Sequence, residues 1–153
     1  MGLQSMMYLA LRDGPPKPVP PRVIAAQLKV SPTYLAKVLG LLVKAGLLES
    51  HRGTRGGVRI TLEPRTVHLL DIVEACQGKI LGHYCTGEGS PHLVCGYHRA
   101  MFDLHEATVS VLKRWTLGDL VSSPIPHTSL CGLVNCKTQQ VLPPKRRRLQ
   151  KAK

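Results

Sequence analysis

The strongest constraint in the sequence is a helix with both ends specified, over residues 31–46. Ser31 is a favoured N-cap residue, and Pro32 has the fixed φ that the first helical turn accepts. Gly46 can end the helix in the left-handed conformation. Apolar residues recur every three or four positions and predict the buried face: Leu35, Val38, Leu39, Leu42 and Val43. The opposite face is predicted to be exposed, and carries Thr33, Lys37, Gly40 and Lys44.

A short hairpin is predicted directly after this helix. Residues 47–51 (LLESH) and 57–62 (GVRITL) have the composition of strands, and the tip between them reads RGTRG. Glycines at positions 53, 56 and 57 permit a tight turn and a close backbone approach. The tip therefore presents two cations, Arg52 and Arg55, on a narrow backbone.

The preceding elements complete a recognisable order. Residues 2–12 are predicted as a helix, 13–21 as a proline-rich turn and 22–28 as a short helix, with only Lys29 and Val30 before Ser31. Two helices, a tight connection, a capped helix and a hairpin are the order of a winged helix-turn-helix. The predicted fold class is mostly α with a small β-hairpin, in which a winged helix-turn-helix domain is followed by a long dimerisation helix. A plain helical bundle with a surface hairpin is the alternative.

In a helix-turn-helix, the helix after the turn enters the major groove of DNA with its N-terminal residues. In this sequence that helix is the capped one, over residues 31–46. Here those residues are Ser31, Thr33, Tyr34 and Lys37. Hydroxyl groups reach phosphates, whereas Lys reaches a phosphate or a base edge. Arg on a narrow tip can approach the DNA backbone or the minor groove. The tip is not a phosphate-binding loop, because it lacks the Gly-Lys-Ser/Thr ending and precedes a strand.

The charge of the chain points to a polyanionic partner. Residues 1–66 carry ten Lys and Arg against three acids, and residues 145–153 carry six basic residues and no acid. This distribution is typical of nucleic-acid binders. A basic surface that serves only solubility is the alternative, as is a sequence-indifferent nucleic-acid binder driven by the basic tail.

The sequence resembles the IscR/NsrR type of winged-helix transcriptional regulators, on the stretches AAQLKVSPTYLAKVLGLLVKAGLLES, RGTRGGVRITLEP and LLDIVEACQG. The resemblance implies a homodimer that binds a palindromic operator in double-stranded DNA, most often as a repressor, and that senses stress through an iron–sulfur cluster. It carries the DNA contacts over to Ser31, Pro32, Thr33, Tyr34 and Lys37 on the helix and to Arg52, Gly53 and Arg55 on the wing.

A long helix is predicted from Tyr97 to about Arg114 or Trp115, after a loop without clean periodicity at 79–96. Apolar residues alternate spacings of three and four and make a seam for a partner helix: Met101, Leu104, Thr108, Val111 and Trp115. The partner helix could be intramolecular. The resemblance implies that the seam is the dimer interface.

Three side chains around the loop suit a soft metal centre. Cys85, Cys95 and His98 combine thiolates with an imidazole, which fits an iron–sulfur cluster or zinc. Cluster-binding relatives carry three cysteines here; this chain has two, so a [2Fe–2S] cluster would need a further ligand such as His83, His92 or a residue of the partner subunit. The alternatives are zinc and a metal-free thiol switch that pairs Cys85 with Cys95. Cys76 is predicted to be a buried structural thiol.

The predicted organisation has three parts. Residues 1–66 form the DNA-binding domain, residues 67–121 form the sensor loop and dimerisation helix, and residues 122–153 form a flexible basic tail.

No stretch is long and apolar enough for a membrane span, so a cytoplasmic protein without a membrane partner is expected. The sequence supplies no orienting acid or oxyanion site beside Cys95 and His98, and an enzyme is not expected.

Overall fold

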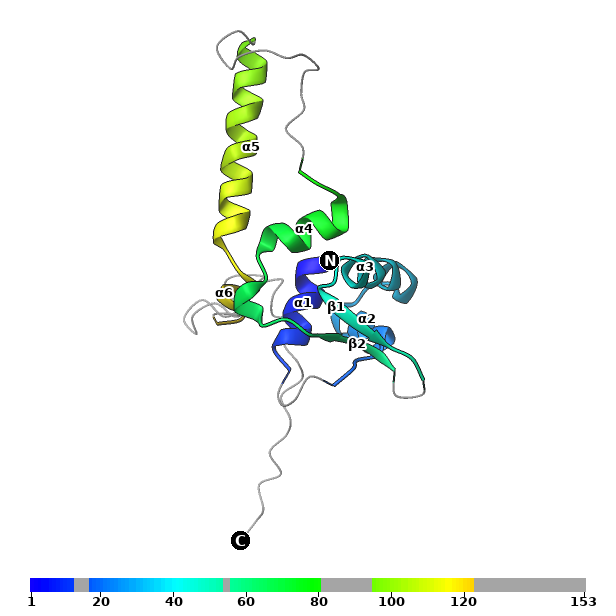
Figure 1. The fold of residues 1–153 in the computed structure, drawn as a ribbon. Helices are drawn as coiled ribbons and strands as arrows, with labels where there is room; N and C mark the ends of the chain where they lie inside the picture. The colour runs from blue at the N-terminus through cyan, green and yellow to red at the C-terminus, as the bar shows by residue number, and fades with distance from the viewer. Residues whose placement is uncertain (13–16, 54–55, 81–94, 123–153) are drawn as a thin grey trace, which may run out of the picture.

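The computed structural model describes residues 1–12, 17–53, 56–80 and 95–122. The first three helices are α1 (Gly2–Ala10), α2 (Pro21–Leu28) and α3 (Pro32–Lys44). The hairpin is β1 (Leu48–His51) with β2 (Gly57–Ile60), and a 3-10 turn η1 (Pro64–Thr66) follows it. The remaining helices are α4 (Leu69–Gln77), α5 (Gly96–Arg114) and α6 (Leu117–Ser122). The fold class predicted from the sequence is confirmed: helices dominate and the sheet is a two-stranded antiparallel hairpin (Figure 1).

The connection between α2 and α3 is as tight as predicted. Pro21 occupies the first turn of α2, and Lys29 ends that helix with a positive φ of 55°. Its main-chain amide bonds back to the carbonyl oxygens of Ala25 and Ala26. This left-handed residue satisfies the last carbonyls of α2 and turns the chain within two residues into α3.

The hairpin is anchored by a strand contact that the sequence did not reveal. Val19, inside the segment predicted as a turn, forms an antiparallel bridge with Val58 through N–O distances of 2.8 and 2.9 Å. The backbone at Val19 passes so close to Gly57 that a Cβ there would lie 2.3 Å from the Val19 carbonyl. Glycine at position 57 is therefore required by this approach.

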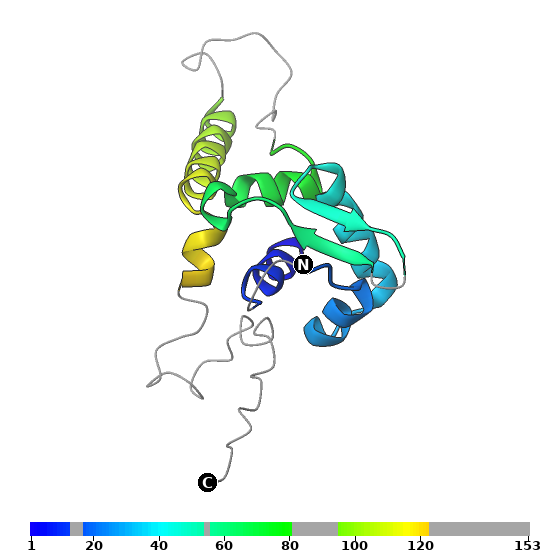
Figure 2. The same ribbon diagram turned by 60° about the horizontal axis from the view of Figure 1, so that its bottom comes forward.

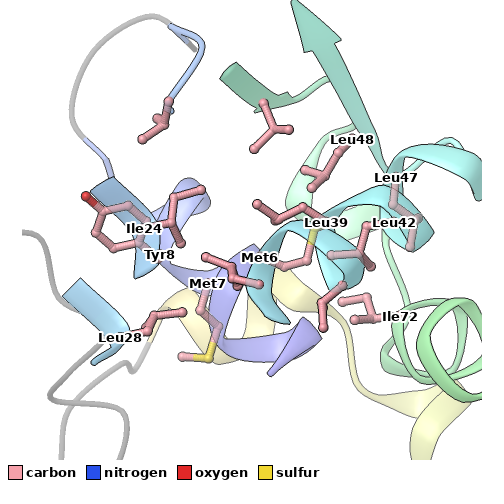
Figure 3. Close-up of a cluster of buried hydrophobic side chains, with 14 of the residues drawn as sticks. Met6, Met7, Tyr8, Ile24, Leu28, Leu39, Leu42, Leu47, Leu48 and Ile72 are labelled. Atoms are coloured by element: carbon pink, nitrogen blue, oxygen red, sulfur yellow. The ribbon is translucent and has the colours of Figure 1, made fainter. Parts of the chain in front are cut away.

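The core gathers one face from each helix of the winged-helix region. Met6, Tyr8, Ile24, Leu39 and Ile72 come from α1, α2, α3 and α4, and each is at most 2% exposed. Figure 3 shows these side chains converging between the helices. Leu48 of β1 and Leu117 of α6 close the cluster. The core thus fixes α3 from one side and leaves its other side to solvent.

The long helix α5 extends away from this body (Figures 1 and 2). None of its residues is buried. Its C-terminal end is tied to the start of α4 by an antiparallel bridge between His68 and Thr116, and α6 then returns to pack on η1 and α1. No helix in these described ranges is long and apolar enough to cross a membrane.

Element existence was predicted well and boundaries less so. The first helix ends at Ala10 rather than residue 12, and both strands are shorter than predicted. The turn η1 and the helix α6 were not predicted from the sequence. The predicted tail began at residue 122, the last residue of α6; residues 123–153 lie outside the described residues.

Candidate nucleic-acid interface

Helix α3 presents an uncovered polar face. Leu35, Val38, Leu39 and Leu42 are buried and Val43, also predicted for this face, is half-buried, whereas Thr33, Lys37, Gly40 and Lys44 are all exposed. This is the division predicted from helical periodicity, because residues at spacings of three and four share a face. The exposed face is about three turns long and carries two lysines, so it can meet a polyanion without rearrangement of the core.

The first turn of α3 leaves its polar groups available. Ser31 occupies the N-cap position with extended backbone, and Pro32 follows in the first turn. Ser31 thus takes the predicted N-cap position, but its side chain makes no capping hydrogen bond to the N-terminal amides of α3. Ser31, Pro32 and Thr33 are exposed, and the Tyr34 side chain is 53% exposed. The N-terminal end of a helix is favourable for a phosphate oxygen.

The wing lies on the same side of the molecule as α3, since β1 packs against that helix (Figure 1). Arg52 and Gly53 are exposed at the start of the tip, and Gly53 has a φ of 107°. The amide of Gly56 donates to the carbonyl oxygen of Gly53 at 2.9 Å and closes the turn. Residues 54–55 lie outside the described residues, so the side chain of Arg55 is not placed.

A charged cluster on the outer face of the hairpin was missed in the sequence. Arg59 donates from Nε and Nη2 to Oε2 of Glu49 at 3.0 and 2.8 Å, and Nε2 of His51 lies 3.5 Å from the other oxygen of Glu49. The hydrogen bonds from Arg59 hold the pKa of Glu49 below its ordinary value. The sequence places positions 49 and 51 on one face of the strand, but only the strand register, which pairs Glu49 with Arg59, identifies the cluster.

A cleft with a volume of ≈ 180 Å³ separates the first turn of α3 from α1 and α4. Tyr34 and Val38 line one wall, and Ile72 and Cys76 line another. Cys76 is half-buried rather than fully buried as predicted, and burial raises the pKa of its thiol. A Cβ at Gly2 would lie 2.5 Å from the Cys76 sulfur, so α1 and α4 are in tight contact beside the cleft.

Two of the three predicted metal ligands are placed at the start of α5. Cys95 is the N-cap residue, exposed and not in a disulfide. His98 lies one turn later, and its Nδ1 is buried without a hydrogen-bond partner in the described part of the chain. Cys85 lies outside the described residues. Among the residues that are described, no three His, Cys, Asp or Glu side chains gather as a metal site. A thiol and an imidazole one turn apart fit a soft metal centre as a partial ligand set.

Comparisons with known proteins agree with this geometry. The model of the family described as "Rrf2: Iron-dependent Transcriptional regulator" matches residues 1–123. The HTH-type transcriptional repressor NsrR of Streptomyces coelicolor is 33% identical over 127 residues, which cover 81% of this chain and 85% of that protein. The HTH-type transcriptional regulator IscR of Vibrio vulnificus is 31% identical over 107 residues, covering 69% of this chain and 64% of its own length.

The fold has solved counterparts as well. The structure of CymR, the global cysteine regulator of Bacillus subtilis, superposes with a TM-score of 0.66 at 30% identity, covering 79% of this chain and 90% of that one. IscR of T. potens superposes with a TM-score of 0.61 at 25% identity, covering 85% and 90%. The family match spans both the winged helix and α5. The chain belongs to the Rrf2 family of winged-helix transcriptional regulators.

Proposed function

We propose that this regulator is a homodimeric repressor that reads a palindromic DNA operator with α3 and the wing. The observation that carries the proposal is the polar face of α3, whose residues Thr33, Lys37, Gly40 and Lys44 are all exposed. The proposed contacts are Ser31, Pro32, Thr33, Tyr34 and Lys37 on α3 and Arg52, Gly53 and Arg55 on the wing.

The proposal of a dimer rests on α5. Its seam of Met101, Leu104, Thr108, Val111 and Trp115 extends by the same spacing to Tyr97, and Tyr97 and Leu104 are 64% and 55% exposed. A monomer gains nothing from such a stripe, whereas a partner helix would bury it. A two-fold dimer presents two copies of α3, which matches an operator with two inverted half-sites.

Sensing is proposed for the segment between α4 and α5. Cys95 and His98 would hold an iron–sulfur cluster, together with Cys85 and one ligand that is not assigned. A bound cluster would supply a redox- and iron-dependent constraint on the two chain segments that ligate it. Helix α4 leads directly into this segment and packs against α3. The proposed result of ligation is therefore a change in how α4 supports α3, in addition to any change in the spacing of the two DNA-binding heads.

A metal-free thiol switch is the second candidate for the sensor. It is favoured by the exposure of Cys95, which an oxidant can reach. Anaerobic purification followed by iron and sulfide analysis and a visible absorption spectrum separates the two. Charge-transfer bands with stoichiometric iron support a cluster. Colourless, iron-free protein that forms a Cys85–Cys95 disulfide on oxidation supports the switch.

Selection of duplexes from a random-sequence library tests the DNA-binding proposal. The full chain should enrich an inverted repeat, and a chain lacking residues 145–153 should enrich the same repeat at lower affinity. Loss of all sequence preference with the tail would instead support the sequence-indifferent binder. Enrichment of no sequence by the full chain would contradict the proposal.

A further inference from the structure

The sequence of the part of the chain proposed to face DNA contains a single carboxylate among many basic residues. Between residues 17 and 62 the sequence holds eight basic residues, Lys17, Arg22, Lys29, Lys37, Lys44, Arg52, Arg55 and Arg59, and the sole acid is Glu49. Glu49 lies on β1, in the wing itself. A carboxylate near phosphates opposes binding through like-charge repulsion, so its surroundings decide what it does there.

Glu49 accepts hydrogen bonds from Arg59 on one of its oxygens and has His51 close to the other. The hairpin register places Arg59 directly opposite Glu49, and the Arg59 guanidinium donates from Nε and Nη2 to Oε2 at 3.0 and 2.8 Å. Oε1 lies 3.5 Å from Nε2 of His51, two residues along the same strand. The side chains of Arg59 and Glu49 are 35% and 44% exposed, so the pair sits on the surface but is not extended into solvent.

The pairing changes what Arg59 can offer to DNA. Two N–H groups of its guanidinium already donate to Glu49, and the carboxylate compensates its charge. Arg52, at the start of the wing tip, is exposed. The same hairpin thus carries one exposed cation at the tip, Arg52, and one that is paired across the strands, Arg59.

We propose that Glu49 is a specificity-determining positioning residue that holds Arg59 against the hairpin and withdraws this cation from phosphate contact. The inference rests on the DNA-binding function proposed above and adds to it. Contacts between free cations and phosphates strengthen binding to every sequence alike. Neutralising Arg59 therefore lowers affinity for non-operator DNA and raises the ratio by which the operator is preferred.

A double-substitution cycle tests the proposal, with the selected operator and a scrambled duplex of equal length as probes at several salt concentrations. E49A frees Arg59, so affinity for the scrambled duplex should rise several-fold. The slope of log affinity against log salt concentration should become steeper by about one, because one more counterion is released. R59A leaves an unpaired carboxylate and should weaken binding to both duplexes. The E49A/R59A protein lacks the whole neutral pair and should return close to the wild-type affinities.

The control is Asp103→Asn, which removes one negative charge from an exposed site on α5 and should leave both affinities unchanged. If Arg59 contacts a phosphate directly, R59A and E49A/R59A should bind DNA equally weakly. In both proteins the slope of log affinity against log salt concentration should then become shallower by about one. A purely structural role predicts weaker binding of E49A to both duplexes with a lower melting temperature. Either result overturns the inference.

Failure of the proposed function gives a different pattern. In that case the wild-type chain enriches no operator, and the cycle has no sequence preference to change. A wild-type chain that prefers its operator, combined with an E49A protein that binds both duplexes as the wild type does, overturns only the role of Glu49.

Discussion

The amide of Leu69 donates a hydrogen bond to the carbonyl oxygen of Trp115 at 3.0 Å. Leu69 begins α4, and Trp115 is the C-cap residue of α5. A second bond, from the Leu117 amide to the Val67 carbonyl oxygen at 2.8 Å, completes an antiparallel bridge around His68 and Thr116. The C-terminal end of α5 is therefore joined to the winged-helix core through the main chain. The proposed metal ligands lie at the other end, about 28 Å away for a helix of 19 residues.

This junction has no room for a side chain at Gly118. A Cβ there would lie 2.7 Å from Cγ of Arg65 and 3.0 Å from its Cα. Gly118→Ala should lower the free energy of unfolding by about 1–3 kcal/mol, because backbone must move to relieve the overlap. The matched control is Gly40→Ala on α3, which meets nothing within 4 Å and should stabilise the protein by about 0.5–1 kcal/mol. Urea denaturation of both proteins measures the difference, and equal effects would contradict this packing.

The junction is also expected to respond to acid. The main-chain amide of Thr116 donates to Oδ2 of Asp119 at 2.8 Å, and with the Thr116 hydroxyl it lowers the pKa of Asp119 below its ordinary value of 3.8. A lowered pKa in the folded state stabilises the protein above the ordinary value, and that contribution is lost as the pH falls through the folded value. Asp119→Asn should therefore flatten the dependence of stability on pH below about pH 4. Unchanged acid sensitivity would rule out this contribution.

Replacement of a residue in the α5 seam should separate the proposed dimer. Leu104→Glu places a charge in the centre of the stripe, so association should weaken by at least about tenfold, the effect of 1.4 kcal/mol. Ser110→Glu adds the same charge to another exposed position on α5, outside the seam, and should leave the dimer intact. Sedimentation velocity over a range of concentrations gives the dissociation constants. A Leu104→Glu protein that associates like the wild type would remove α5 as the interface.

The two cysteines that the structure describes should react at different rates. Cys95 is exposed, whereas Cys76 is half-buried beside Gly2 and burial raises the pKa of its thiol. The thiolate is the reactive form, so alkylation at neutral pH should modify Cys95 well before Cys76. Peptide mapping by mass spectrometry after timed treatment of anaerobic, metal-free protein measures both rates. Faster modification of Cys76 would contradict its packing.

The sequence predicted those features that depend on local signals. Periodicity separated the buried and exposed faces of α3, and Gly46 ended that helix with a φ of 76°. The contacts of Val19 with Val58 and of Val67 with Leu117 were out of reach, since each joins segments that carry no local sign of pairing. The pairing of Glu49 with Arg59 became visible only through strand register. The role of Arg55 and Cys85 stays a prediction, because both lie outside the described residues.

The most direct test of DNA reading by α3 compares Lys37→Ala with Lys113→Ala in binding to the selected operator at several salt concentrations. Both substitutions remove one exposed lysine, the first from the face of α3 and the second from α5. Lys37→Ala should lose about tenfold or more in operator affinity, as expected for one lost base or charged contact of about 1–3 kcal/mol, whereas Lys113→Ala should bind like the wild type. Equal affinities for the two variants would contradict the claim that α3 reads DNA.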